Sequence, residues 1–246
     1  MGPSIILNQT GLIIGDNTLL KPANLTLEAG KLHLLTGPNG AGKSSLLRSM
    51  MGLMPHSGDI HWQWPGKASL PAYIPQLAFF DATLPVTVED YLHASIHTRA
   101  FFLKKSKAQK QRLQSLLEKV GLQDKTQRKL GQLSGGERQR LLFARALAQD
   151  TTLWFMDEPM TGLDQDAQQT IEQLILQLKA QRCTLVMVHH DHDFVRRHAD
   201  QVVVVNQGIE RSGSPEQIYG ASHNQDDIPA RSLTVSRTSS TSEVCS

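Results

Sequence analysis

Glycine, lysine and serine gather in residues 37–44, which are Gly-Pro-Asn-Gly-Ala-Gly-Lys-Ser. A glycine, four residues and then Gly-Lys-Ser is the spacing of a phosphate-binding loop, the P-loop. Its glycines let several backbone N–H groups point at one phosphate, and the helix that follows presents its positive end to the same anion. Lys43 would reach the β- and γ-phosphates of a nucleotide, and the Ser44 hydroxyl would ligate magnesium. The alternative is a chance glycine turn, which would not need the strand and helix that the sequence predicts on either side.

Two carboxylates follow the apolar run at residues 153–156. Asp157 could hold a magnesium ion, usually through one of its waters, and Glu158 could polarise the attacking water as a general base. Alone, such a pair more often caps a helix or lies in a solvated turn. The P-loop upstream favours the catalytic interpretation.

A second glycine-rich helix start occurs at residues 133–140, Leu-Ser-Gly-Gly-Glu-Arg-Gln-Arg. Ser134 would cap the helix, and the helix end would form a second anion site. An isolated Ser-Gly-Gly would be explained as an ordinary capped helix.

Residues 133–140, however, resemble the signature motif of the ATP-binding-cassette (ABC) ATPases. Residues 73–76 (Tyr-Ile-Pro-Gln) resemble the Q-loop of that family, and residues 162–164 (Gly-Leu-Asp) resemble its D-loop. Residues 188–191 (Val-His-His-Asp) resemble the switch region, where a histidine contacts the γ-phosphate. The usual switch has threonine before that histidine, so alignment puts the switch at His190 and leaves His189 in the threonine position. Together with the P-loop, these motifs make five markers in the order typical of the family, which is a highly specific set.

The resemblance implies ATP and magnesium as cofactors and assigns roles to individual residues. The implied catalytic residues are Gln76, Glu158 and His190. The implied nucleotide contacts are Gly37, Pro38, Asn39, Gly40, Ala41, Gly42, Lys43, Ser44, Ser45, Ser134, Gly135, Gly136 and Asp164. The implied magnesium contacts are Ser44, Gln76 and Asp157.

The resemblance also implies a head-to-tail pair of cassettes with two ATP molecules between them. Each ATP would lie between the P-loop of one subunit and the signature helix of the other, so that ATP closes the dimer and hydrolysis reopens it. Many relatives stack an aromatic residue on adenine, but the corresponding region near Ile14 has none. Ile14 would be an apolar platform instead, and selectivity for ATP over GTP would be loose.

Residues 76–121 include the helical lobe that meets the membrane subunit in this family. Leu-Pro-Val-Thr-Val at residues 84–88, with the Phe-Phe and Ser-Lys-Ala runs of residues 101–108, is similar to the ATPases of manganese, zinc and iron uptake systems. The expected partners are a membrane permease, a second ATPase subunit and an extracytoplasmic solute-binding protein, with the chain peripheral on the cytoplasmic face of the inner membrane. Phe79 and Phe80 would form the docking groove or pack in the core.

Other functions stay open at this point. The cassette could serve another importer or a small exporter. Soluble ABC ATPases of ribosomes usually carry two cassettes and those of DNA repair carry coiled coils, whereas this chain has one cassette, no sustained heptads and a net charge of +2. A GTPase would carry an Asn-Lys-x-Asp motif, which is not found. A kinase would not explain the signature helix, and the charge gives no indication of nucleic acid.

The elements that must position these residues follow from apolar patterning. Short apolar runs predict strands at residues 5–7, 12–14, 32–36, 58–64, 72–75, 153–156, 185–188 and 202–205. Helices are expected from residue 43 to 51 and after the caps Ser106, Ser134 and Asp164, with another opening at residues 87–90. The alternation predicts an α/β fold: a mostly parallel sheet core flanked by helices, with a β subdomain and an inserted helical lobe.

Composition sets the outer limits of the prediction. The chain has 246 residues, with 39% hydrophobic and 20% charged residues, as in a soluble globular protein. We expect one ATPase domain over residues 1–220, with the core at 1–77 and 149–220, the helical lobe at 78–148 and a disordered tail at 221–246. The two cysteines lack metal or redox spacing, which favours a reduced cytoplasmic setting. No apolar run is long enough to span a bilayer, and residues 1–8 lack the features of an export signal.

Overall fold

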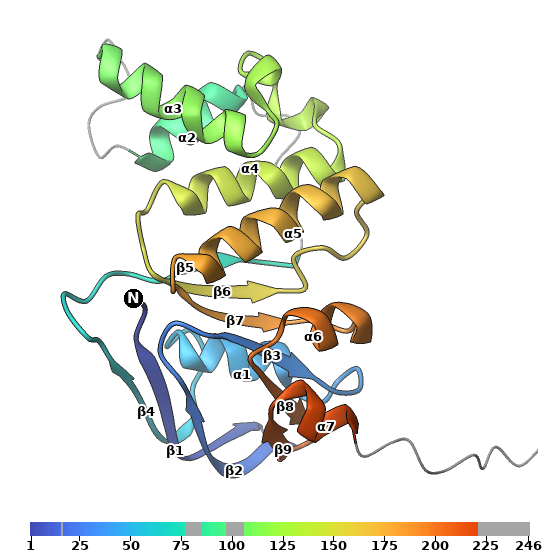
Figure 1. The fold of residues 1–246 in the computed structure, drawn as a ribbon. Helices are drawn as coiled ribbons and strands as arrows, with labels where there is room; N and C mark the ends of the chain where they lie inside the picture. The colour runs from blue at the N-terminus through green and yellow to red at the C-terminus, as the bar shows by residue number, and fades with distance from the viewer. Residues whose placement is uncertain (16, 77–84, 97–105, 221–246) are drawn as a thin grey trace, which may run out of the picture.

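The computed structural model describes residues 1–15, 17–76, 85–96 and 106–220, and within them two sheets form. A three-stranded antiparallel sheet has the order β2-β1-β4, and a six-stranded sheet has the order β5-β6-β7-β3-β8-β9. In the larger sheet β5, β6, β7, β3 and β8 are parallel, and β9 runs antiparallel to β8. This mostly parallel sheet with helices around it is the α/β fold that the sequence predicts (Figure 1).

The elements have the following bounds. The strands are β1 (Ser4–Ile14), β2 (Asn17–Leu27), β3 (Leu32–Thr36), β4 (Ser57–Gln63), β5 (Ala72–Ile74), β6 (Leu153–Asp157), β7 (Thr184–Val188), β8 (Gln201–Val205) and β9 (Ile209–Gly213). The α-helices are α1 (Lys43–Met50), α2 (Val88–Ile96), α3 (Lys107–Lys119), α4 (Gly135–Leu147), α5 (Gln165–Ala180), α6 (His192–His198) and α7 (Pro215–Tyr219). Two 3₁₀ turns, Gln123–Lys125 and Leu130–Gln132, lie between α3 and α4.

Both faces of the large sheet are buried, each in its own core. Along β6, Leu153 and Phe155 face the core made with α1 and the antiparallel sheet, whereas Trp154 and Met156 face the core made with α2, α3, α4 and α5. Successive side chains of a strand point to opposite faces, so a strand covered on both faces must be apolar throughout. The continuous apolar runs in the sequence therefore mark the inner strands of the sheet.

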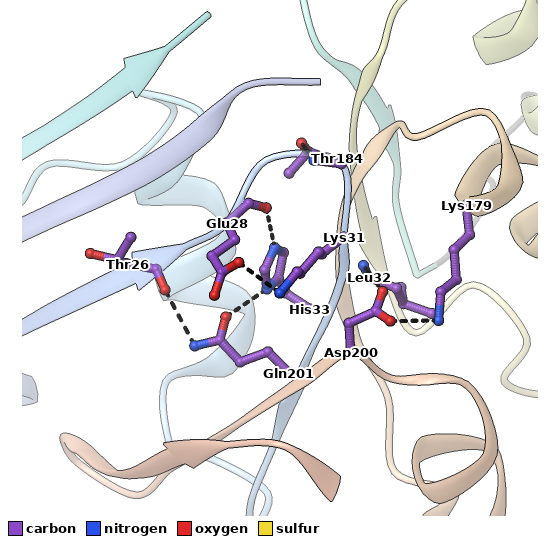
Figure 2. Close-up of polar contacts among 10 residues, drawn as sticks. Thr26, Glu28, Lys31, Leu32, His33, Lys179, Thr184, Asp200 and Gln201 are labelled. Atoms are coloured by element: carbon purple, nitrogen blue, oxygen red, sulfur yellow. Dashed lines mark hydrogen bonds and ion pairs between the residues drawn. The ribbon is translucent and has the colours of Figure 1, made fainter. Parts of the chain in front are cut away.

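The start of β3 is fixed by polar contacts from distant parts of the chain (Figure 2). The Leu32 N–H donates to the Asp200 carboxylate at 2.8 Å. The buried His33 ring lies 2.8 Å from the Glu28 carbonyl and 2.8 Å from the Gln201 side-chain oxygen, and its burial lowers the pKa of the imidazole. These contacts hold the start of β3 against the end of β2 and the start of β8. They therefore fix the direction in which β3 leads into the P-loop.

The three predicted helix caps are all present. Ser106, Ser134 and Asp164 occupy the N-cap positions of α3, α4 and α5, and each side chain accepts a hydrogen bond from the first turn. Such bonds satisfy backbone N–H groups that have no partner within the helix. The sequence therefore located these helix starts to the residue.

Some expectations concern parts of the chain that lie outside the described residues. These are the pair Phe79 and Phe80, Leu84, the Phe-Phe run at residues 101–102, the tail at 221–246 and the side chain of Ile14. In the ranges that the structure does describe, none of the helices has the length and apolar character to cross a bilayer.

Candidate active site

The P-loop connects the carboxyl end of β3 to the start of α1. Gly37 has a φ of 134°, and a Cβ there would clash with the Val205 carbonyl of β8, so only glycine fits. The buried Lys43 side chain reaches back along the loop, and its Nζ donates to the carbonyls of Gly37 at 2.9 Å and Pro38 at 2.8 Å. The lysine charge is thereby held against the loop whose N–H groups would hold phosphate.

A hydrogen bond of 2.7 Å from the Ser44 hydroxyl to the Asp157 carboxylate joins the P-loop to the end of β6. Asp157 is 1% exposed, and its burial raises the pKa of the carboxyl group in spite of the Ser44 hydrogen bond. The Arg48 guanidinium lies 3.9 Å from the Asp157 carboxylate. A hydroxyl beside a buried carboxylate offers the oxygen ligands that magnesium prefers.

The arrangement fits magnesium held together with a nucleotide better than a metal held by protein alone. In the described portion of the chain no cluster of three or more His, Cys, Asp or Glu side chains could hold a metal ion. Magnesium in nucleotide sites usually keeps several waters and takes one or two protein ligands besides the phosphates. Ser44 and Asp157 form a pair of this kind.

The three residues predicted to be catalytic meet at one carboxylate. Glu158 Oε2 accepts a hydrogen bond of 3.0 Å from the Gln76 side-chain amide and lies 3.9 Å from His190 Nδ1. The three residues follow β5, β6 and β7, which are neighbours in the sheet. In Figure 1 the carboxyl ends of β6 and β7 lie on the same side of the molecule as the loop after β3. Parallel strands place their carboxyl ends along one edge, which is where ligands of open α/β sheets bind.

Glu158 is also held by its own loop. Its backbone has a φ of 47°, which is unusual for a residue with a side chain. The Glu158 N–H donates to the Val188 carbonyl at 3.1 Å, and the Thr161 hydroxyl donates to Glu158 Oε2 at 3.1 Å. The carboxylate is thus positioned from β7 and from the segment that leads into the D-loop.

The two histidines of the switch differ sharply in environment. The His190 side chain is 64% exposed, whereas His189 is 4% exposed. Neither ring nitrogen of His189 has a hydrogen-bond partner, and the ring packs edge-on against Phe194 with centroids 4.7 Å apart. Burial lowers the pKa of His189 to about 4, so its ring is neutral at neutral pH. The sequence predicts no such contrast, because an unpaired buried histidine has no local signal.

A cavity of about 190 Å³ adjoins His189. It is lined by both switch histidines, by Met160 and Gly162 of the D-loop region, and by Glu172 of α5. His198 is half-buried, and its Nε2 lies 2.9 Å from the Glu172 carboxylate.

The signature turn and the D-loop lie side by side. Ser134 and Glu137 bond reciprocally at the start of α4, and the Asp164 carboxylate accepts from the Ala167 N–H at 2.9 Å at the start of α5. A Cβ on Gly136 would come within 3.0 Å of the Ala167 side chain, so these two helix ends approach closely. The sequence predicts a second anion site at the start of α4, and this helix start is separate from that of α1.

Three contributors to the site were not predicted from the sequence. Thr161 bonds to Glu158, Arg48 lies near Asp157, and the Gln139 amide donates to the Pro75 carbonyl at 3.3 Å, next to Gln76. Arg48 acts across a long sequence separation and belongs to none of the motifs. Gln139 lies in the signature motif, but its contact with Pro75 joins distant parts of the chain. Thr161 is three residues from Glu158, so a threonine hydroxyl within reach of the general base was a usable signal.

Comparison with known proteins identifies close sequence relatives. The family profile for ABC transporters matches residues 20–161. The manganese transport system ATP-binding protein MntB of Listeria monocytogenes is 36% identical over 219 residues, which is 85% of this chain and 90% of that protein. The zinc import ATP-binding protein ZnuC of Pseudomonas aeruginosa is 38% identical over 216 residues, 87% of this chain and 76% of that protein.

Solved structures resemble the fold over most of its length. A metal-chelate type ABC transporter in an inward-facing conformation matches with a TM-score of 0.73 and 25% identity, over 88% of this chain and 85% of that one. A dimeric ATP-binding cassette in a post-hydrolysis state, with ADP and phosphate bound, matches with a TM-score of 0.72 and 21% identity, over 86% of this chain and 98% of that one.

Proposed function

Because the chain belongs to the ABC transporter family and is the ATPase subunit of such a transporter, we propose that it powers import of a transition-metal ion through a separate membrane permease. The cargo is manganese, zinc or iron. Support comes from the relatives that carry the names of manganese and zinc transport proteins and align with 80–89% of this chain. The partners are the permease, a second ATPase subunit and an extracytoplasmic solute-binding protein, and the chain works at the cytoplasmic face of the membrane.

In the proposed mechanism the P-loop N–H groups and Lys43 hold the β- and γ-phosphates of ATP. Ser44, Gln76 and, through water, Asp157 would hold magnesium, which would supply positive charge to the phosphate oxygens. The Glu158 carboxylate accepts a proton from the attacking water while the water oxygen bonds to the γ-phosphorus and the bond to the ADP oxygen breaks. His190 contacts the γ-phosphate that is transferred.

The second subunit completes each site. Ser134, Gly135 and Gly136 of one chain meet the γ-phosphate bound by the P-loop of the other, and Asp164 supports that contact from the D-loop. The nucleotide held by a chain's own P-loop uses only one of its two anion-binding helix ends. The other end, at Ser134, is therefore available to the nucleotide of the second subunit. Hydrolysis removes the phosphate that bridges the subunits, so the dimer reopens.

The observation that carries the mechanism is the meeting of Gln76, Glu158 and His190 beside the Ser44–Asp157 hydrogen bond. A Glu158→Gln substitution keeps the hydrogen-bonding shape but removes the base. We expect nucleotide binding to persist and turnover to fall by at least about 100-fold. Steady hydrolysis in this variant would remove Glu158 as the base.

The cargo is tested in cells under metal limitation. Cellular manganese, zinc and iron are compared between strains that produce the normal protein, the Glu158→Gln variant or the control Glu118→Gln, which changes an exposed glutamate on α3. We expect one metal to fall selectively in the Glu158→Gln strain and no change in the control strain. Unchanged levels of all three metals would reject metal import and leave the ATPase assignment intact.

A further inference from the structure

Glu137 is a buried carboxylate at the start of the signature helix. Its side chain is 9% exposed, and its Oε2 accepts the Ser134 N–H at 2.9 Å while the Ser134 hydroxyl accepts the Glu137 N–H at 3.2 Å. This reciprocal pair sets the backbone of residues 134–137 and leaves the N–H groups of Gly135 and Gly136 to bind an anion. The orientation of this helix start therefore depends on where the Glu137 carboxylate lies.

Lys125 neutralises this carboxylate from outside the helix. Its ammonium is hydrogen-bonded and ion-paired to Glu137 Oε1, and Arg128 lies 3.9 Å from the same oxygen. The Lys125 side chain is 31% exposed, so the pair is largely shielded from water. A buried carboxylate that loses its counter-ion is strongly disfavoured. The two Glu137 oxygens are thus divided between Ser134 and Lys125.

Residues 125–130, the 125–130 strap, are fixed in turn to the start of α2. The Glu89 N–H donates to the Thr126 carbonyl at 2.9 Å, and the Val88 N–H donates to the Arg128 carbonyl at 3.0 Å. The Leu130 N–H donates to the Val86 carbonyl at 3.0 Å. Three backbone hydrogen bonds fix the main chain beside Lys125 relative to α2, so its side chain extends toward Glu137 from a defined place.

We propose that Lys125 is a positioning residue for ATP hydrolysis: acting through Glu137, it holds the Ser134 turn in the orientation that engages the nucleotide of the second subunit. The inference rests on the proposed head-to-tail mechanism and adds a residue that none of the sequence motifs contains. Without Lys125 the Glu137 carboxylate turns toward water and releases the Ser134 N–H. The P-loop of the same chain is untouched, so binding of nucleotide to a single subunit stays normal.

The test separates nucleotide binding by a single subunit from ATP-dependent dimerisation of two subunits. Lys125→Met is introduced into the Glu158→Gln background, and ADP affinity and ATP-dependent dimerisation are measured. We expect ADP affinity to stay within about twofold and the ATP concentration for half-maximal dimerisation to rise by at least about tenfold, a change of about 1.4 kcal/mol. In the otherwise normal chain the same substitution lowers the hydrolysis rate, and Lys125→Arg restores most of it.

A matched control lies four residues further along the same strap. Lys129 is exposed, and its backbone forms a bridge with Thr87, so Lys129→Met removes the same charge without touching Glu137. We expect this variant to dimerise and hydrolyse ATP like its parent. An equal loss in Lys129→Met would mean that general charge, and not the pair with Glu137, matters, and it would overturn the proposal.

A double-mutant cycle with Glu137→Gln tests whether Lys125 acts through the carboxylate. Glutamine keeps an acceptor for the Ser134 N–H but carries no charge, so Lys125→Met should add little in that background. Full additivity of the two effects would overturn the proposal. Loss of ADP binding in Lys125→Met would also overturn it, because the effect would then not be confined to the signature turn.

Two different failures can be told apart. If the Glu158→Gln parent stays monomeric with ATP and magnesium, the head-to-tail mechanism fails and this inference falls with it. If the parent dimerises and Lys125→Met dimerises at the same ATP concentration, only the role of Lys125 is rejected.

Discussion

Among single residues, Asp157 carries a carboxylate whose negative charge is disfavoured by burial. It is almost fully buried, and burial outweighs the hydrogen bond from Ser44 and the charge of Arg48, so the pKa of its carboxyl group is raised. A carboxyl group with a raised pKa binds protons more tightly in the folded than in the unfolded chain. The charged form of Asp157 therefore lowers stability at neutral pH in the protein without nucleotide.

We expect Asp157→Asn to raise the free energy of unfolding of the nucleotide-free protein at pH 7 while impairing magnesium-dependent hydrolysis. The gain should shrink as pH falls through the raised pKa and vanish below the ordinary aspartate value of about 3.9, where the normal carboxyl is also uncharged. Urea denaturation across that pH range measures this, with Asp59→Asn, an exposed position on β4, as the control. A less stable Asp157→Asn at pH 7 would contradict the expectation.

His189 should show the opposite pH dependence. Burial lowers the pKa of His189 in the folded chain to about 4, below the ordinary histidine value of about 6.5. Between these two values the unfolded chain binds more protons than the folded chain. The stability is therefore complete above pH 6.5 and is lost as pH falls from 6.5 through 4. Near pH 4 the loss approaches about 3 kcal/mol. We expect His189→Thr, which restores the usual family residue, to flatten this part of the stability curve.

The matched control for that measurement is His61→Thr on β4, because His61 is exposed. The buried His33 titrates in the same direction and is present in the normal chain and in both variants, so its contribution cancels. Equal acid sensitivity of the normal chain and His189→Thr would show that the buried ring of His189 does not limit stability at low pH.

Among the elements, the sequence predicted those with strong local signals and missed the others. Continuous apolar runs located β3, β6, β7 and β8, and polar caps located three helix starts. It did not predict β2, because Asn17–Leu27 contains Lys21, Pro22 and Asn24, which disfavour strands and are tolerated in an edge strand with bulges. The short α6, α7 and β9 were also missed, since a few residues give too little periodicity.

The candidate site was predictable to the same extent. Every predicted catalytic residue follows an apolar strand, so the motifs and the parallel sheet together indicated that the side chains would meet. Contacts that depend on the packing of distant segments, such as Arg48 near Asp157 or Lys125 on Glu137, could not be read from local pattern. They required the relative placement of helices that only the folded chain supplies.

Two glycines of the P-loop allow a test of how β3 and β8 constrain the loop. Gly37 combines a φ of 134° with a clash between any Cβ and the Val205 carbonyl, whereas Gly40 has a φ of 78° and nothing within 4 Å of a Cβ. We expect Gly37→Ala to cost about 3 kcal/mol or more and Gly40→Ala about 1 to 2 kcal/mol. Urea midpoints of the nucleotide-free variants give the comparison. Equal losses would mean that β8 does not limit the loop.

For the whole molecule, we expect nucleotide to control how two copies assemble. In the proposed head-to-tail pair, the helix ends at the P-loop and at Ser134 would each bind phosphate. Association through two shared nucleotides would bury both ends at once. Binding that depends on ligands held between subunits makes assembly a function of nucleotide state.

We expect the Glu158→Gln protein to sediment as a dimer with ATP and magnesium and as a monomer with ADP, because ADP lacks the phosphate that the second subunit engages. Adding Lys43→Ala should abolish the dimer by weakening nucleotide binding. A monomer under all conditions would contradict the head-to-tail arrangement, and a dimer with ADP would show an interface that does not need the γ-phosphate.

The strand order also governs when the site can form during synthesis. β3 lies between β7 and β8, and the Ser44–Asp157 hydrogen bond joins residues 113 positions apart. At translation rates of about 5 to 20 residues per second, the P-loop leaves the ribosome about 6 to 23 seconds before the residues that complete its magnesium site. Through that interval β3 has both edges unpaired. The nascent chain must therefore protect an aggregation-prone strand before nucleotide can stabilise it.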